Sequence, residues 1–127
     1  MSRAKWWWLI GAFVLCFLAG GVIWWRGSYP EYLDGSFHWE TVPLLASVAL
    51  FLSWVIGAGI VASALAPASA FTAVILARVV LDGMENSSNH NLWPFEMAVA
   101  FGFGMLMSFP AAALGGLIRR LRYRSRA

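Results

Sequence analysis

Residues 42–77 form one continuous stretch without a single Asp, Glu, Lys, Arg or His. A helix that crosses the hydrocarbon core of a bilayer needs about 20 apolar residues. The stretch is therefore too long for one crossing and long enough for two, so a turn must lie inside it. We place this turn at 63–67, because the residue before a proline resists helical geometry and Pro67 suits the first turn of a new helix.

The rest of the chain has the same membrane character. Of the 127 residues, 61% are hydrophobic and 12% are charged, which is about half the charge of an ordinary soluble domain. Two further apolar stretches flank the central one. The sequence therefore predicts an all-α integral membrane four-helix bundle made of one domain, residues 1–127, with spans at about 6–25, 42–63, 67–82 and 93–118.

Polar residues separate the predicted spans. They predict an outer loop at 26–41, a second outer loop at 83–92 and a basic cytoplasmic tail at 119–127. Gly83 follows Asp82 as the left-handed residue that ends a helix. Tryptophans at 6–8 and 24–25 lie about 25 Å apart on a helix and are predicted to mark the two membrane interfaces.

Most of the positive charges lie near the two ends of the chain. Arg3 and Lys5 precede the first predicted span, and a run of arginines follows the last. An even number of spans places both termini on the same side, which the positive-inside rule identifies as cytoplasmic. The predicted location is the cytoplasmic membrane, the inner membrane of a bacterium, and the same distribution of charge argues against a nucleic-acid partner.

One face of the fourth predicted span carries a small residue at every fourth position. Small residues let helix backbones approach closely in lipid, where there is little hydrophobic force between helices. The pattern predicts packing within the bundle, and a contact with a second copy or another membrane subunit remains an alternative. The residues are Ala100, Gly104, Ser108, Ala112 and Gly116.

The C-terminal arginines are the flank that sets topology. They are also predicted to contact the headgroups of anionic lipids, each contributing about 1 kcal/mol near a charged surface. The residues concerned are Arg119, Arg120, Arg122, Arg124 and Arg126.

The ionisable residues around the second outer loop are the candidate functional site. Arg78 and Asp82 are four apart, so they share a helix face, and Glu96 falls in the first turn of the next span. The three residues are predicted to meet near the outer interface. Both a structural ion pair and a role in handling a proton or polar substrate remain open.

Four further residues are weaker candidates. Imidazole and carboxylate groups bind zinc, iron or manganese, but these residues lack a diagnostic ligand spacing and fit solvated loops equally well. No metal is predicted. The residues are Glu85, His90, His38 and Glu40.

The chain lacks a cysteine pair, a glycine-rich phosphate loop and a serine nucleophile motif, so no cofactor is predicted. The favoured function is a non-catalytic accessory or stabilising subunit of a membrane assembly, in contact with lipid and with other subunits or itself. The first alternative is a compact oligomeric transporter or channel that uses Arg78, Asp82 and Glu96 near its outer mouth. A membrane enzyme that acts on lipid is the second.

Overall fold

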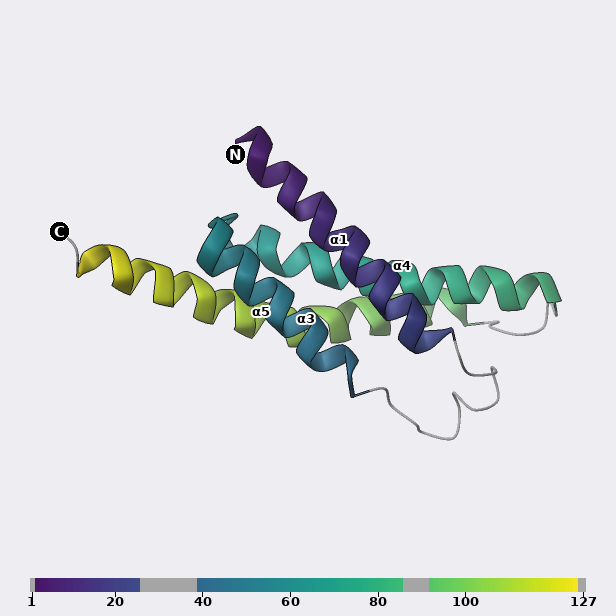
Figure 1. Ribbon diagram of the computed structural model, residues 1–127. Coiled ribbons are helices and arrows are strands. Elements are labelled where there is room, and N and C mark those ends of the chain that lie inside the picture. The colour runs from purple at the N-terminus through teal and green to yellow at the C-terminus, as the bar shows by residue number, and fades with distance from the viewer. Residues whose placement is uncertain (1, 26–38, 86–91, 126–127) are drawn as a thin grey trace.

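The computed structural model describes residues 2–25, 39–85 and 92–125, apart from the side chain of Glu85. Four helical rods pack together in this part of the chain (Figure 1), so the all-α, four-helix part of the prediction is confirmed. The rods are α1 (Arg3–Trp24), α3 (Thr41–Phe51) continued by the π-helix η1 (Leu52–Ile56), α4 (Ile60–Glu85) and α5 (Trp93–Arg124).

Three of the rods are long and apolar enough to cross a membrane. They are α1 with 22 residues, α4 with 26 and α5 with 32. The rod made of α3 and η1 contains 11 and 5 residues, so its length is no more than about 24 Å. It is shorter than the hydrocarbon core of a typical bilayer, which is about 30 Å thick.

The turn between the second and third rods lies at Gly57–Gly59, and the prediction of a turn at 63–67 is wrong. Gly57 has φ 67° and Gly59 has φ 92°, values that side chains disfavour and glycine tolerates. Helix α4 instead continues through Pro67, whose side chain is fully buried. Neighbouring helices compensate for the lost backbone bond at such prolines in membranes. The second rod is therefore short and the third long, the reverse of the prediction.

Two predicted boundaries also move outward. The predicted helix end at Asp82 and Gly83 is wrong, because α4 continues to Glu85 and Gly83 does not have a positive φ. Helix α5 continues to Arg124, so most of the predicted basic tail is helical. Most of the predicted outer loops, residues 26–38 and 86–91, lies outside the described residues.

The core takes residues from all four rods, and the most extensive contacts are those of α5 with α4 and α3. Glycines bring the backbones into contact there: a Cβ at Gly104 would lie 2.9 Å from the Cα of Ala68, and one at Gly115 would lie 2.7 Å from the carbonyl oxygen of Leu50. The buried residues of α5 are Ala100, Gly104, Ser108, Ala112 and Gly115. Gly116, the fifth residue of the predicted face, is half-buried against the side chain of Ile60.

The two groups of tryptophans in α1 have different environments. Trp6, Trp7 and Trp8 are 57%, 71% and 51% exposed, as expected of side chains at a lipid interface. Trp24 is buried and its Nε1 donates a 2.7 Å hydrogen bond to the hydroxyl of Thr41. Trp25 Nε1 donates to the carbonyl oxygen of Val74 at 3.2 Å. The second group therefore ties α1 to α3 and α4, and does not simply mark an interface.

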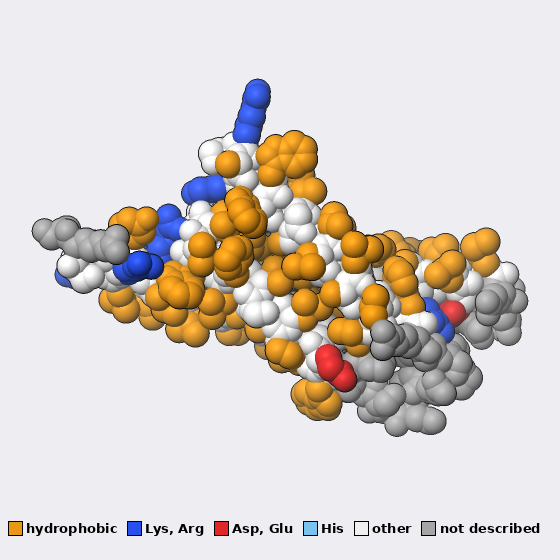
Figure 2. Space-filling model, viewed as in Figure 1, with side chains coloured by type: hydrophobic (Ala, Val, Ile, Leu, Met, Phe, Trp, Pro, Cys, Tyr) orange, Lys and Arg blue, Asp and Glu red, His pale blue; other side chains and the backbone are white. Residues whose placement is uncertain are grey.

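The two ends of the bundle differ in charge. The N-terminal end of α1, the C-terminal end of α5 and the Gly57–Gly59 turn lie at one end, and the C-terminal ends of α1 and α4 and the N-terminal ends of α3 and α5 lie at the other (Figure 1). Lysine and arginine side chains gather at the first end, and Asp and Glu side chains lie toward the second (Figure 2). We call these the basic end, which includes Lys5 and Arg119, and the acidic end, which includes Arg78, Asp82 and Glu96.

Candidate functional site

Arg78 and Asp82 form an ion pair at the acidic end. Arg78 Nε lies 2.8 Å from Asp82 Oδ2, and the two side chains are only 14% and 11% exposed. Arg78 Nη1 also donates a 3.5 Å hydrogen bond to the carbonyl oxygen of Trp25. The Trp25 indole donates to the carbonyl oxygen of Val74, which lies one turn before Arg78 on α4. The ion pair is therefore part of a set of polar contacts that connect the end of α1 with α4.

Glu96 lies in the first turn of α5 and is half-buried. Its backbone N–H donates to the carbonyl oxygen of Leu92 at 3.1 Å. Within the described part of the chain, Arg78 pairs with Asp82 and with the Trp25 carbonyl and not with Glu96. Of the three residues predicted to meet, Arg78 and Asp82 are therefore in contact. A role for Glu96 stays a prediction.

Of the four weaker candidates, the structure describes the side chain of Glu40 alone. His38, His90 and the side chain of Glu85 lie outside the described residues. Glu40 is exposed just before α3 and makes no side-chain hydrogen bond to the start of that helix.

Replacing Arg78 by methionine is expected to lower the free energy of unfolding by about 3 kcal/mol, because it removes the guanidinium that faces a largely buried carboxylate. The double variant Arg78→Met/Asp82→Leu is expected to regain most of this loss, since the carboxylate that Arg78 faced is removed as well. Unfolding of the purified variants by SDS titration measures both effects. A double variant as unstable as Arg78→Met would show that the loss has another origin.

At the basic end, two cations bind carbonyls in the last turn of η1 and at Gly57, the residue that follows it. Arg119 Nη1 donates to the carbonyl oxygens of Trp54 and Val55 at 3.1 and 3.2 Å, and Lys5 Nζ donates to that of Gly57 at 2.7 Å. The last carbonyls of a helix lack partners inside it and carry a partial negative charge, so cations are favoured there. We call these contacts the basic clasp, and they join α1, η1 and α5.

The basic clasp was not predicted, because Arg3 and Lys5 were assigned to topology and the C-terminal arginines to topology and to lipid headgroups. A usable signal was present in the two glycines at 57 and 59, which are typical of a helix end with exposed carbonyls. No sequence rule connects such an end with a lysine 52 positions before it or an arginine more than 60 positions after it.

A groove of about 530 Å³ opens beside the basic clasp, between the start of α4 and the end of α5. Ile60 and Val61 line one wall, and Gly116, Arg119, Arg120 and Tyr123 line the other. The Arg119 guanidinium lies 5.3 Å from the centre of the Tyr123 ring, a cation–π distance. Arg120 is exposed and makes no hydrogen bond or ion pair with any other residue that the structure describes.

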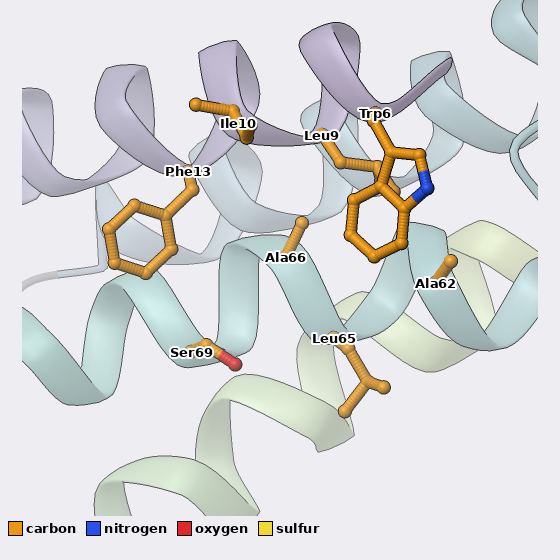
Figure 3. Close-up of a pocket in the computed structure, with 8 residues that line it drawn as sticks. All are labelled: Trp6, Leu9, Ile10, Phe13, Ala62, Leu65, Ala66 and Ser69. Carbon is orange, nitrogen blue, oxygen red and sulfur yellow. The ribbon is translucent and has the colours of Figure 1, made fainter. Parts of the chain in front are cut away.

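A second groove, of about 350 Å³, lies between α1 and α4 (Figure 3). Its lining is almost wholly apolar. Trp6 and Phe13 reach from α1 toward α4, with Ala66 between them (Figure 3). Leu9, Ala62 and Leu65 complete most of the surface.

The three long apolar helices and the broad apolar exterior define the class: the chain is a small multi-pass integral membrane protein in contact with the lipid bilayer. No protein-family model, curated protein or solved structure matches the chain.

Proposed function

We propose that all four rods cross the membrane, with both termini and the basic end on the cytoplasmic side. The concentration of lysine and arginine at that end supports this orientation through the positive-inside rule (Figure 2). The short rod of α3 and η1 is accommodated by local thinning of the bilayer, which has a modest cost per ångström of mismatch. The basic clasp stabilises this short rod in the membrane, because its cations neutralise the partial negative charge of the carbonyls at the end of η1.

The protein acts, in this proposal, as a non-catalytic accessory or stabilising subunit of a membrane assembly. The observation that carries the proposal is the backbone contact of α5 with both of its neighbours at Gly104 and Gly115. Helices held at this distance have little freedom to separate, because a packed interior resists continuous deformation. Such a bundle suits a rigid scaffold better than a path that opens and closes.

Helix α1 offers the surface for a partner. It packs mainly on α4, and its outward stripe of Val14, Leu18 and Val22 is 46%, 58% and 54% exposed. Gly11 lies on the same exposed side, and a Cβ built there has nothing within 4 Å. A small residue within an apolar stripe lets a second transmembrane helix approach closely. The partner in this proposal is therefore an apolar helix of another membrane subunit.

Gly11→Leu is the test. Among the described residues, none lies within 4 Å of a Cβ at the exposed Gly11, so the fold is expected to survive, while a partner helix that approaches at Gly11 is displaced. We expect co-purification of the partner from native membranes to fall roughly tenfold, the loss produced by about 1.4 kcal/mol. Mass spectrometry of tagged protein purified in mild detergent measures it.

Gly102→Leu is the matched control, since Gly102 is also exposed on a long helix and has open space around its Cβ position. It is expected to leave co-purification unchanged. Equal recovery of partners with both variants, or a chain that purifies alone from native membranes, would refute an accessory role through α1.

A transporter or channel is the second candidate. The observation that favours it is the ion pair of Arg78 and Asp82 within an apolar helix, because ionisable groups inside membrane helices often mark ion or substrate paths. Flux assays on the purified protein in liposomes separate the two functions. Transport that is lost in the Arg78→Met/Asp82→Leu variant, while its stability is kept, would favour transport over the accessory role.

A further inference from the structure

The C-terminal arginines that the structure describes, Arg119, Arg120, Arg122 and Arg124, differ in their positions. Arg119 is half-buried and already committed to the carbonyl oxygens of Trp54 and Val55. Arg120 lines the 530 Å³ groove and pairs with no other residue that the structure describes. Arg122 lines a separate groove with Trp54 and Val55, and Arg124, exposed in the last turn of α5, lines neither groove. Since Arg119 is committed to the η1 carbonyls, Arg120 is the arginine that is available to a ligand in this groove.

The groove has the chemistry of a site for a phosphate ester. Arg119 and Arg120 both line it, and because Arg119 is bound to the η1 carbonyls, the fork of Arg120 is the one that can match two oxygens of a phosphate. Its volume falls within the range of about 300–1,000 Å³ that is usual for small-molecule sites. Tyr123, at the same rim, combines a ring with a hydroxyl, which suits the boundary between lipid and water.

The surface next to the groove is apolar and continues along α4. Val61 lines the groove and is 60% exposed, and Leu65, one turn further along the same face, is 39% exposed. Leu65 also lines the apolar groove between α1 and α4 (Figure 3). From Ala62 to Ser69 this second groove follows α4 for about 10 Å. If a phosphate bound at Arg120 carries a hydrocarbon chain, the first part of that hydrocarbon chain would lie against this apolar surface.

We propose that the groove between the start of α4 and the end of α5 binds the phosphate of an anionic phospholipid, with one acyl chain lying past Val61 and Leu65 into the groove between α1 and α4. Arg120 is the headgroup ligand. Arg119 is a positioning residue, held by the η1 carbonyls and by Tyr123. This site is independent of the partner surface on α1 and of the orientation of the chain.

The test is a titration of the full chain in neutral detergent with phosphatidylglycerol labelled on its acyl chain, followed by fluorescence anisotropy. The salt concentration is held at about 0.5 M, where the Debye length is only about 4 Å and the general attraction of a basic surface is screened. Arg120→Gln is expected to weaken binding about tenfold, the effect of losing a charge-assisted hydrogen-bonded contact. Arg124→Gln removes the same charge and is expected to change the affinity less than twofold.

Two competitors identify the source of the phosphate. Neither inorganic phosphate, which has no acyl chain, nor phosphatidylcholine, which has no net charge, is expected to displace the labelled lipid at equal concentration. Displacement by inorganic phosphate would show that the groove binds phosphate without an acyl chain. Displacement by phosphatidylcholine would show that Arg120 does not select an anionic headgroup. Equal losses in the two glutamine variants, or none in either, would also overturn the proposal. Arg120 is exposed, so the fold of its variant is checked by circular dichroism.

Discussion

Gly57→Ala is expected to lower the free energy of unfolding by about 3 kcal/mol, which combines the strain of a side chain at positive φ with the loss of contacts made by Arg119. Gly57 has φ 67°, and a Cβ there would collide with the guanidinium of Arg119. Arg119 would have to leave the carbonyl oxygens of Trp54 and Val55. One methyl group therefore disturbs both the turn and the basic clasp.

Gly83→Ala is the matched control for this substitution. Gly83 lies inside α4, and a Cβ built there has nothing within 4 Å. Alanine is expected to be neutral or to stabilise by up to about 1 kcal/mol, because it is the better helix former. SDS titration of the purified proteins measures both variants. A Gly57→Ala protein as stable as the parent would show that the turn is not at Gly57.

The double variant Gly104→Ala/Gly115→Ala is expected to lose about 4–5 kcal/mol, since each overpacked position costs typically 1–3 kcal/mol and the two sites are far enough apart to add. The new methyl at Gly104 would meet the Cα of Ala68, and that at Gly115 the carbonyl oxygen of Leu50. Both neighbours are backbone atoms, which cannot move aside by changing a rotamer. Helix α5 must then separate from α4 and α3.

Gly102→Ala serves as the control on the same helix. Gly102 lies only two residues from Gly104, but it is exposed and its Cβ position is open. It is expected to leave the unfolding transition within about 0.5 kcal/mol of the parent, as surface substitutions usually do. Similar losses at Gly102 and Gly104 would mean that helix flexibility, rather than backbone contact, sets the stability.

The membrane class and the inner face of α5 were predictable for physical reasons. Length and hydropathy limit what a chain without water around it can form, and a recurrence of small residues every four positions marks where helices touch. Gly104 and Ala112 are buried as this reasoning expects. Gly115 is buried more deeply than Gly116, a difference that depends on the rotation of α5 against η1 and cannot be seen in a pair of adjacent glycines.

The position of the turn was not predictable from Pro67. The residue before a proline disfavours helical geometry, but a proline inside a membrane helix is tolerated where neighbouring helices pack around it, and Pro67 is fully buried. Gly57 and Gly59 were the better signal. Glycine is also common at packing faces in membranes, as at Gly104, so its presence alone does not separate a turn from a contact.

The ion pair and the basic clasp differ in how far they could be read from sequence. Arg78 and Asp82 are four residues apart on one helix, so their contact follows from local geometry. The contacts of Lys5 and Arg119 with η1 depend on how three helices end at the same level. A turn at 63–67 would place the end of the second rod at a different depth, so these contacts could not be predicted from it.

The most direct test of the membrane fold is the reaction of single cysteines with a membrane-impermeant maleimide, in a Cys16→Ala background. Val61→Cys lies just after the Gly57–Gly59 turn, Ser125→Cys just after α5, and Met84→Cys at the far end of α4. The fold predicts that Val61→Cys and Ser125→Cys react from one side of the membrane and Met84→Cys from the other. Reaction of Val61→Cys and Met84→Cys from the same side would contradict a membrane-spanning α4 and the bundle built around it.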